Sequence, residues 1–136
     1  MRLGAIVLDS DNIEALSDFY AKLLGWTKSS QMHDGEKWIT VIKPDYTEIP
    51  LVFQENPDHK KPIWPSTKTE QQQMIHMDFY VKADEYDGAV KHAIHCGAKP
   101  AQSQLSNDWT VMTDLSGHPF CIIPLPKEVY EERYGA

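Results

Sequence analysis

The first residues of the chain show two different spacings of apolar side chains. Residues 3–9 form a short apolar run, which predicts a buried strand. From Ile13 to Leu24 the apolar residues recur every three or four positions, the spacing of an amphipathic helix that faces a core. Gly25 can end this helix, because glycine accepts the left-handed backbone of a C-terminal cap. The residues before the helix supply three candidate N-caps, Ser10, Asp11 and Asn12.

More strands are predicted in the rest of the first half. Residues 26–33 and 38–43 flank an Asp-Gly pair, an arrangement typical of a β-hairpin. A Pro-Asp pair ends the second of these strands, and Leu51–Glu55 predicts another short one. The first module, residues 1–55, therefore has the predicted order β-α-β-β-β.

Residues 56–73 differ from the segments on either side of them. Three prolines interrupt this stretch, and charged and amide side chains fill it, which is typical of a linker over the surface. Trp64 is the unusual residue of this linker. We interpret Trp64 as an anchor that holds the linker against the sheet, and the alternative is a lid over a pocket.

The same order of patterns returns in residues 74–124, the second module. Residues 74–81 predict a strand, and Asp84 is a candidate N-cap for the apolar helical pattern that follows. Further strands are predicted at residues 99–104, 109–114 and 119–123. The tail, residues 125–136, is predicted to carry a short amphipathic helix over residues 127–133, with a frayed end as the alternative.

The two modules also match in detail, as an internal repeat does. The matched segments are Leu24-Gly25 with Cys96-Gly97, Trp38-Ile39-Thr40-Val41 with Trp109-Thr110-Val111-Met112, and Ile49-Pro50-Leu51-Val52-Phe53 with His118-Pro119-Phe120-Cys121-Ile122. One module alone cannot bury both faces of its sheet. The sequence therefore predicts an α+β fold in which duplicated β-α-β-β-β modules form a curved mixed sheet of half-barrels. We expect the sheet to surround a concave cavity suited to a small-molecule ligand, with the helices on the convex side.

Composition and charge narrow the class of partner. The 136 residues suit a single compact domain, and the net charge of -7 argues against a surface that binds nucleic acid. No apolar run is long enough to span a bilayer, and the first residues reach an Asp too early for a signal peptide. Only two cysteines occur, without paired spacing, so reduced thiols are expected. We therefore expect a cytoplasmic protein with no nucleic-acid or membrane partner.

Several stretches of the chain resemble those of a known family. They are Leu8-Asp9 with Phe19-Tyr20 and Leu23-Leu24-Gly25-Trp26, then Ile75-His76-Met77-Asp78, and finally Asp114-Leu115-Ser116-Gly117-His118-Pro119-Phe120-Cys121. The last stretch is similar to an Asp-Pro-x-Gly-Asn-x-Phe-Cys end motif. With these stretches the chain resembles the vicinal-oxygen-chelate superfamily, also called the glyoxalase/bleomycin-resistance/dioxygenase fold, and within it the bacterial glyoxalase-like domain branch. The resemblance covers nearly the whole chain and implies a homodimer.

The resemblance also implies where a metal would bind. Enzymes of this superfamily hold a divalent metal through four positions, on the first and last strands of each module. In this chain the four positions are occupied by His76, Ala5, Val52 and Cys121. Alanine and valine cannot ligate, and a buried cysteine is more commonly a small apolar residue. We therefore expect no cofactor and no complete catalytic metal site. The other donors available to a rearranged divalent-metal site are Glu55, His118 and His33.

Other residues are predicted to contact a ligand in the cavity. Strand alternation places three polar side chains on one face, those of His76, Asp78 and Tyr80. Trp38 and Trp109 begin equivalent strands and either line the cavity or fill the core, two interpretations that we weigh evenly. Gln54 is a further candidate, on the last strand of the first module. Aromatic walls with few polar groups suit flat or cationic organic ligands, and Asp78 favours a positive charge.

These observations leave more than one function open. The first is a protein that binds a small organic ligand without a metal, as bleomycin-resistance relatives sequester drugs. The alternative is a metal-dependent lyase, isomerase or dioxygenase with a rearranged ligand set that includes His76. A third option is a non-catalytic regulatory module. On the second predicted helix we interpret His92 and His95 as exposed residues, and the alternative is a metal cluster with Cys96.

Overall fold

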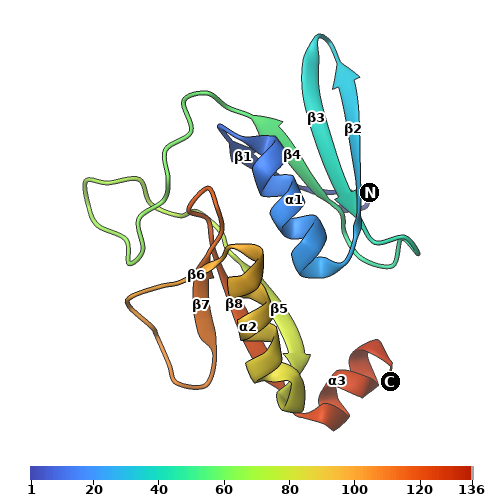
Figure 1. Cartoon of the computed structure of the whole chain (residues 1–136), viewed down its shortest axis with the longest axis vertical. Helices are drawn as coiled ribbons and strands as arrows, with labels where there is room; N and C mark the ends of the chain where they lie inside the picture. Colours follow the sequence, from blue (N-terminus) through green and yellow to red (C-terminus); the bar gives the residue numbers. More distant parts are fainter. Residues whose placement is uncertain (136) are drawn as a thin grey trace. The chain divides into compact units, whose positions relative to one another are not determined.

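The computed structural model describes residues 1–135 and divides the chain into two compact units (Figure 1). The first unit is Met1–Lys60, and the second unit begins at Lys61, inside the segment predicted as a linker. Each unit holds its own open, mixed, four-stranded sheet. The two sheets and their helices confirm the α+β class and the duplicated β-α-β-β-β order. None of the helices in the described residues is long and apolar enough to cross a membrane.

The elements of the first unit follow the predicted order. They are β1 (Ile6–Ser10), α1 (Ile13–Leu24), β2 (Thr27–His33), β3 (Glu36–Ile42) and β4 (Leu51–Glu55). The sheet order is β1-β4-β3-β2, with β1 parallel to β4 and the other two pairs antiparallel. β1 begins at Ile6 rather than at residue 3, because its ladder starts where Ile6 N donates to Pro50 O and β4 follows directly.

α1 begins and ends at residues that the sequence marks as caps. Of the three candidate N-caps, Asn12 is the one used, since its Oδ1 accepts a hydrogen bond from Ala15 N at 3.1 Å. Gly25 ends the helix with a φ of 68°, the left-handed conformation that glycine adopts without strain. Both ends of the predicted helix are therefore confirmed.

α1 covers one face of the first sheet. Phe19 and Tyr20 of the helix are 2% and 0% exposed, and the Tyr20 ring stacks on Phe53 of β4 with 5.8 Å between ring centroids. Ile39 of β3, which is paired with Phe53, is fully buried as well. Since successive strand residues point to opposite faces, Val52, beside Phe53 on β4, points away from α1.

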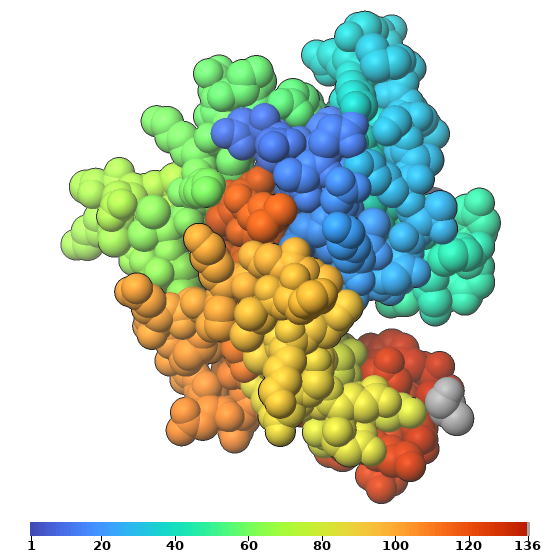
Figure 2. Space-filling model, in the orientation of Figure 1, coloured from blue at the N-terminus to red at the C-terminus, as the bar shows by residue number. Residues whose placement is uncertain are grey.

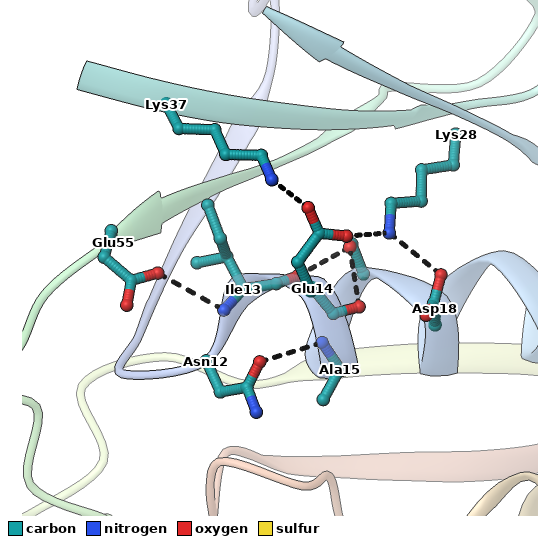
Figure 3. Close-up of polar contacts among 9 residues, drawn as sticks. Asn12, Ile13, Glu14, Ala15, Asp18, Lys28, Lys37 and Glu55 are labelled. Atoms are coloured by element: carbon teal, nitrogen blue, oxygen red, sulfur yellow. Dashed lines mark hydrogen bonds and ion pairs between the residues drawn. The ribbon is translucent and has the colours of Figure 1, made fainter. Parts of the chain in front are cut away.

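A cluster of charged residues connects α1 to the β2–β3 hairpin (Figure 3). Glu14 in the first turn accepts hydrogen bonds from Lys28 of β2, at 2.6 Å, and from Lys37 of β3. Lys28 also donates to Asp18, one turn further along the helix, at 2.9 Å. The hydrogen bonds from Lys28 and Lys37 lower the pKa of Glu14 to about 2. Because the carboxylates are exposed, this cluster orients the hairpin and contributes little to stability.

The second unit repeats the order and adds two helical segments. Its elements are β5 (Met77–Lys82), the 3-10 helix η1 (Ala83–Glu85), α2 (Tyr86–Cys96), β6 (Lys99–Pro100), β7 (Thr110–Thr113), β8 (Pro119–Leu125) and α3 (Lys127–Tyr134). The sheet order is β5-β8-β7-β6, with β5 parallel to β8. α3 confirms the predicted tail helix. It lies against the end of β5, where Lys82 Nζ is 5.7 Å from the centroid of the Tyr130 ring.

The prediction that Asp84 caps the second helix is wrong. Asp84 lies inside η1, and no side chain caps α2, which begins at Tyr86. The 3-10 turn itself occupies a backbone donor that a cap would bind, since Tyr86 N donates to Ala83 O. The Tyr86 hydroxyl also shares a hydrogen bond with the Thr110 hydroxyl on β7, which fixes the start of α2 on the sheet.

The prediction of a strand over residues 99–104 is largely wrong, because β6 contains only Lys99–Pro100. Beyond β6 the Gln104 side chain takes the place of a neighbouring strand. Its Oε1 accepts a hydrogen bond from Val111 N at 2.7 Å, and its Nε2 donates to the carbonyls of Ala101 and Val111, each at 2.8 Å. We call this arrangement the Gln104 clamp. The clamp satisfies the Val111 N–H of β7, and the Val111 carbonyl also accepts a backbone hydrogen bond from Ala101 N at 2.9 Å.

A tight turn at residues 114–118 joins β7 to β8. The Asp114 side chain is fully buried and accepts two backbone hydrogen bonds within the turn, at 2.9 and 3.0 Å. The side chain of His118 is a third partner of this carboxylate, with Nδ1 2.8 Å from Asp114 Oδ2. Gly117 has a φ of 84°, and a Cβ there would lie 2.8 Å from Cβ of Lys61. Glycine is therefore required both by conformation and by space.

Candidate functional site

The polar residues of β5 lie on the face of the second sheet that α2 does not cover. Asp78 is paired with Cys121 of β8, and Cys121 is paired with Val111 of β7, so the three side chains leave the sheet on the same side. Phe79 and Phe120 point to the opposite side, where their ring centroids are 5.6 Å apart. That side packs against α2 and forms the core of the second unit.

The open face of this sheet holds a pocket of about 290 Å³. Its volume is near the lower end of the range for small-molecule sites. The lining residues are Trp64, His76, Asp78, Tyr80, Leu105, Trp109, Val111, Pro119, Cys121 and Ile123. Four of the predicted ligand contacts meet here, namely His76, Asp78, Tyr80 and Trp109.

His76, Asp78 and Tyr80 form the polar wall of the pocket. His76 directly precedes β5, which begins at Met77 rather than at residue 74. Its partner strand explains the later start, since β8 begins at Pro119, directly before the residue opposite Met77. His76 Nε2 lies 3.4 Å from Asp78 Oδ1, and the two side chains are 40% and 37% exposed. Both groups are therefore accessible to a ligand from solvent.

Cys121 lies beneath the polar wall, on the strand next to Asp78. Burial, and after it the negative charge and hydrogen bonding of Asp78, raise the pKa of the Cys121 thiol from 9.0 to about 11. At neutral pH Cys121 is therefore a neutral thiol that donates to the Asp78 carboxylate. A neutral thiol is a poor nucleophile, so the side chain acts as an apolar part of the pocket floor.

Two loops complete the pocket with apolar side chains. Trp64 comes from the predicted linker, and its Nε1 donates to Ser103 O at 3.1 Å. The indole therefore ties its segment to the loop that contains Ser103 rather than to the sheet, and it also lines the pocket. Leu105 comes from the loop that replaces the predicted strand, beside the Gln104 clamp. No sequence pattern marked Leu105, because its position depends on the path of an irregular loop.

Three of the pocket residues could hold a metal ion. One donor atom from each of His76, Asp78 and Cys121 lies within 4.8 Å of the other two, and no other such group of three occurs among residues 1–135. Three protein donors with an open fourth position is the ligand count of catalytic zinc sites. The residues therefore fit a borderline-soft divalent cation after a small side-chain closure and loss of the Cys121 proton.

Asp78 was not among the donors that we weighed for a metal, although a sequence signal was available. Alternation places Asp78 on the face of His76, and the repeat makes Cys121 the counterpart of Val52. What the sequence lacks is the register of β5 against β8, which brings Asp78 opposite Cys121. The structure thus brings His76 and Cys121, two of the residues considered as metal ligands, together and adds Asp78 to them.

The remaining candidates in the first unit lie on its own sheet. Trp38 and Gln54 are directly opposite each other on β3 and β4. They share the face that points away from α1, so both stay available as ligand contacts. Glu55 instead accepts a hydrogen bond from Ile13 N at 3.4 Å, at the start of α1 (Figure 3). Glu55, which we considered as a donor for a rearranged metal site, therefore binds the N-terminus of α1 instead.

Two histidines that we considered as additional donors lie outside the cluster. His118 is paired with Asp114 in the turn between β7 and β8. His33 ends β2 at the tip of the first hairpin, where it is exposed and lies 3.4 Å from the Asp34 carboxylate. Neither histidine belongs to the group of donors around Asp78.

The strand registers show how the row that contains Asp78 differs between the two units. The equivalent rows are Val7-Val52-Thr40 in the first sheet and Asp78-Cys121-Val111 in the second. The repeat thus preserves the row but not its chemistry. Ala5 and Val52, the residues at which the resemblance predicts metal ligands in the first unit, have side chains without a donor atom.

A family model that matches most of the chain identifies its family. The model of the glyoxalase-like domain family matches residues 5–123. The chain belongs to this family, and with it to the vicinal-oxygen-chelate superfamily. Among proteins of curated function, none matches the chain in sequence.

Solved structures with the same fold have diverse names. A glyoxalase/dioxygenase from Nostoc punctiforme has a TM-score of 0.65 and 18% identity, over 93% of this chain and 92% of its own. A glyoxylase/bleomycin resistance protein/dioxygenase domain from Frankia has a TM-score of 0.65 and 13% identity, over 91% of this chain and 97% of its own. A third structure is a mutant fosfomycin resistance protein from Listeria monocytogenes, complexed with Mn(II) and 1S,2S-dihydroxypropylphosphonic acid. It has a TM-score of 0.68 and 12% identity, over 94% of this chain and 95% of its own. At these identities the similarity shows the fold and leaves the ligand of this chain open.

Proposed function

We propose that this protein binds a small, flat organic ligand, neutral or positively charged, in the pocket of the second unit. The observation that carries the proposal is the composition of that pocket. Two indoles and several aliphatic side chains surround a polar wall whose only carboxylate is Asp78. Indole faces attract flat and cationic groups, and a carboxylate with partial exposure pairs with a cation.

The same composition disfavours an anionic ligand such as a phosphonate. Within the described part of the chain, none of the residues that line the pocket is a lysine or an arginine. A phosphonate would lie near Asp78 without a side chain to neutralise it. The phosphonate bound by the fosfomycin resistance protein is therefore a poor guide to the ligand of this chain.

A thermal-shift experiment with matched compounds tests this proposal. Each pair shares one aromatic ring system and differs in charge, as an amine does from the corresponding carboxylate. We expect the amines to raise the melting temperature and the carboxylates to leave it unchanged, because a ligand stabilises the state that binds it. Asp78→Asn should abolish the preference for amines. Asp108→Asn, an exposed loop aspartate outside the pocket, is the matched control and should keep it.

Two outcomes of that experiment would contradict the proposal. The first is a shift that is equal for both members of each pair, or larger for the carboxylates. The second is an amine preference that survives Asp78→Asn, which would place the ligand elsewhere on the protein.

The alternative function, a metal-dependent lyase, isomerase or dioxygenase, has one specific observation in its favour. The donors of His76, Asp78 and Cys121 are close enough to hold a cation. A divalent metal bound there would polarise a carbonyl or enediolate oxygen of a substrate. In that case His76, Asp78 and Cys121 would hold the metal, and Tyr80 would remain to donate or accept a hydrogen bond.

Metal analysis separates the two functions. Untagged protein purified without chelators is dialysed against zinc, manganese, nickel or ferrous iron, and bound metal is measured. A metal-free binding protein should retain no stoichiometric metal at His76. One equivalent of metal that disappears in His76→Ala but remains in His118→Ala would support the alternative and contradict the metal-free proposal.

A further inference from the structure

The last turn of α2 carries a histidine and a cysteine side by side, on the side of the second sheet opposite the pocket. His92 and Cys96 are four positions apart and therefore share one side of the helix. Cys96 Sγ lies 3.8 Å from His92 Nε2 and 4.0 Å from His92 Nδ1. Ala93, which is fully buried, marks the side of α2 that faces the sheet. His92 is exposed and Cys96 is partly exposed, so the pair lies beside that buried strip.

The separation of the two donors suits one metal ion. A zinc ion binds a cysteine sulfur at about 2.3 Å and a histidine nitrogen at about 2.1 Å, which at a tetrahedral angle puts the two ligands about 3.6 Å apart. The observed 3.8 Å differs little from that separation. Rotation of the imidazole about its Cβ–Cγ bond selects the nitrogen that faces the cation. Neither the backbone nor the helix has to move.

The position on the helix also favours a cation. Cys96 is the last residue of α2, and Gly97 caps the helix in a left-handed conformation. The C-terminal end of a helix carries a partial negative charge from its carbonyl groups. A cation at the pair is therefore stabilised by the end of the helix as well as by its two ligands. The atoms of α2, gold in Figure 2, form part of the visible surface, so solvent can supply further ligands.

We propose that His92 and Cys96 form a surface chelate for a borderline-soft divalent cation such as Zn²⁺, with water in the remaining coordination positions. The thiol of Cys96 loses its proton to solvent as the metal–sulfur bond forms, and no electron is transferred. This site lies on the helix side of the second sheet. It is therefore independent of the pocket, of His76 and of the function proposed for them.

Cobalt(II) serves as the probe, because a thiolate bound to cobalt gives a charge-transfer absorption in the near ultraviolet. The untagged chain of 136 residues carries Cys121→Ser, so that Cys96 is its one remaining thiol. We expect the absorption to appear on titration with Co²⁺ and to disappear when Zn²⁺ is added. Cys96→Ser should abolish it, and His92→Ala should weaken the binding of cobalt.

Matched variants make the experiment decisive. His95→Ala changes an exposed histidine in the same turn and should leave the cobalt absorption unchanged. His76→Ala removes the pocket histidine and should also leave it unchanged. Circular dichroism of each variant confirms that α2 is intact. The proposal is overturned if no charge-transfer absorption appears, or if His92→Ala binds cobalt as tightly as the parent.

Discussion

At the scale of single residues, burial and then the neighbouring Asp78 raise the pKa of the Cys121 thiol. The carboxylate and the thiol lie opposite each other on neighbouring strands, and burial and the Asp78 charge keep the thiol protonated. A protonated thiol neither attacks an electrophile nor binds a metal without first losing a proton. Cys121 is therefore a poor nucleophile at neutral pH, which suits a pocket that binds a ligand more than one that uses nucleophilic catalysis.

Cys121 should make the protein less stable at alkaline pH. Its pKa rises from 9.0 to about 11 on folding, so the unfolded chain loses the thiol proton first. As the pH increases from about 9 to about 11, the free energy of unfolding should therefore decrease. Urea unfolding at about pH 8 and about pH 10 measures the decrease. Cys121→Ser should show a smaller decrease than the wild type, and equal decreases would contradict the assignment.

The residues of the pocket were only partly predictable from the sequence. Alternation along one strand correctly placed His76, Asp78 and Tyr80 on one face, because that rule depends on local geometry. The contact between Asp78 and Cys121 depends on the register of two strands that are distant in sequence. Trp64 and Leu105 reach the pocket through irregular segments, whose paths follow from packing and carry no periodic signal.

At the scale of elements, the N-terminus of α1 provides a sharp test of capping. Asn12→Ala should lower the free energy of unfolding by about 1 kcal/mol, because the hydrogen bond from Ala15 N to its side chain is lost. Asp11→Ala, at the neighbouring exposed candidate, is the matched control and should have a much smaller effect. Urea denaturation of both variants measures the difference. A larger effect for Asp11→Ala would show that the cap is assigned to the wrong residue.

The Gln104 clamp should contribute to the stability of the second unit. Gln104→Ala removes three hydrogen bonds to the backbone of Ala101 and Val111. We expect the free energy of unfolding to decrease by about 1–2 kcal/mol, since the partly buried Val111 N–H loses its partner. Gln102→Ala, an exposed glutamine in the same loop, should change it by less than about 0.5 kcal/mol. Similar losses in both variants would indicate that loop composition, and not the clamp, matters.

The elements that the sequence predicted wrongly share a physical cause. Asp84 has the side chain of an N-cap, but a 3-10 turn satisfies the backbone before the cap position is reached. Residues 99–104 have the polar character of an edge strand, but the long side chain of Gln104, rather than a backbone carbonyl, accepts the hydrogen bond from Val111 N. In both places a tertiary or turn contact competes with the local preference, and local patterns do not include such contacts.

At the scale of the whole molecule, the resemblance to the superfamily predicts a homodimer. Sedimentation equilibrium of the untagged chain should give about twice its mass of 15.6 kDa at micromolar concentration. The measurement is repeated with excess EDTA, so that a dimer held together by a metal ion is distinguished from one held by protein contacts alone. A monomer under all conditions would contradict this prediction.

The internal repeat could be recognised from the sequence because each unit buries apolar residues at equivalent positions to form its core. Phe53 of β4 and Ile122 of β8 are matched in the repeat and are both buried. The residues on the open faces are under no such constraint, so Val52 and Cys121 differ although they are counterparts. Periodicity thus predicts which residues fold the chain more reliably than which residues bind a ligand.

The Gln104 clamp has a further consequence for how this protein behaves at high concentration. A strand at the edge of a sheet offers unpaired backbone groups to any other extended chain, and such edges start intermolecular aggregation. At Val111 the backbone N–H and C=O are already occupied by an amide of the same chain. The adjoining β6 contains Pro100, which cannot donate a hydrogen bond. The clamp and the proline together protect this edge of the second sheet from pairing with a strand of another molecule, although β6 itself is short.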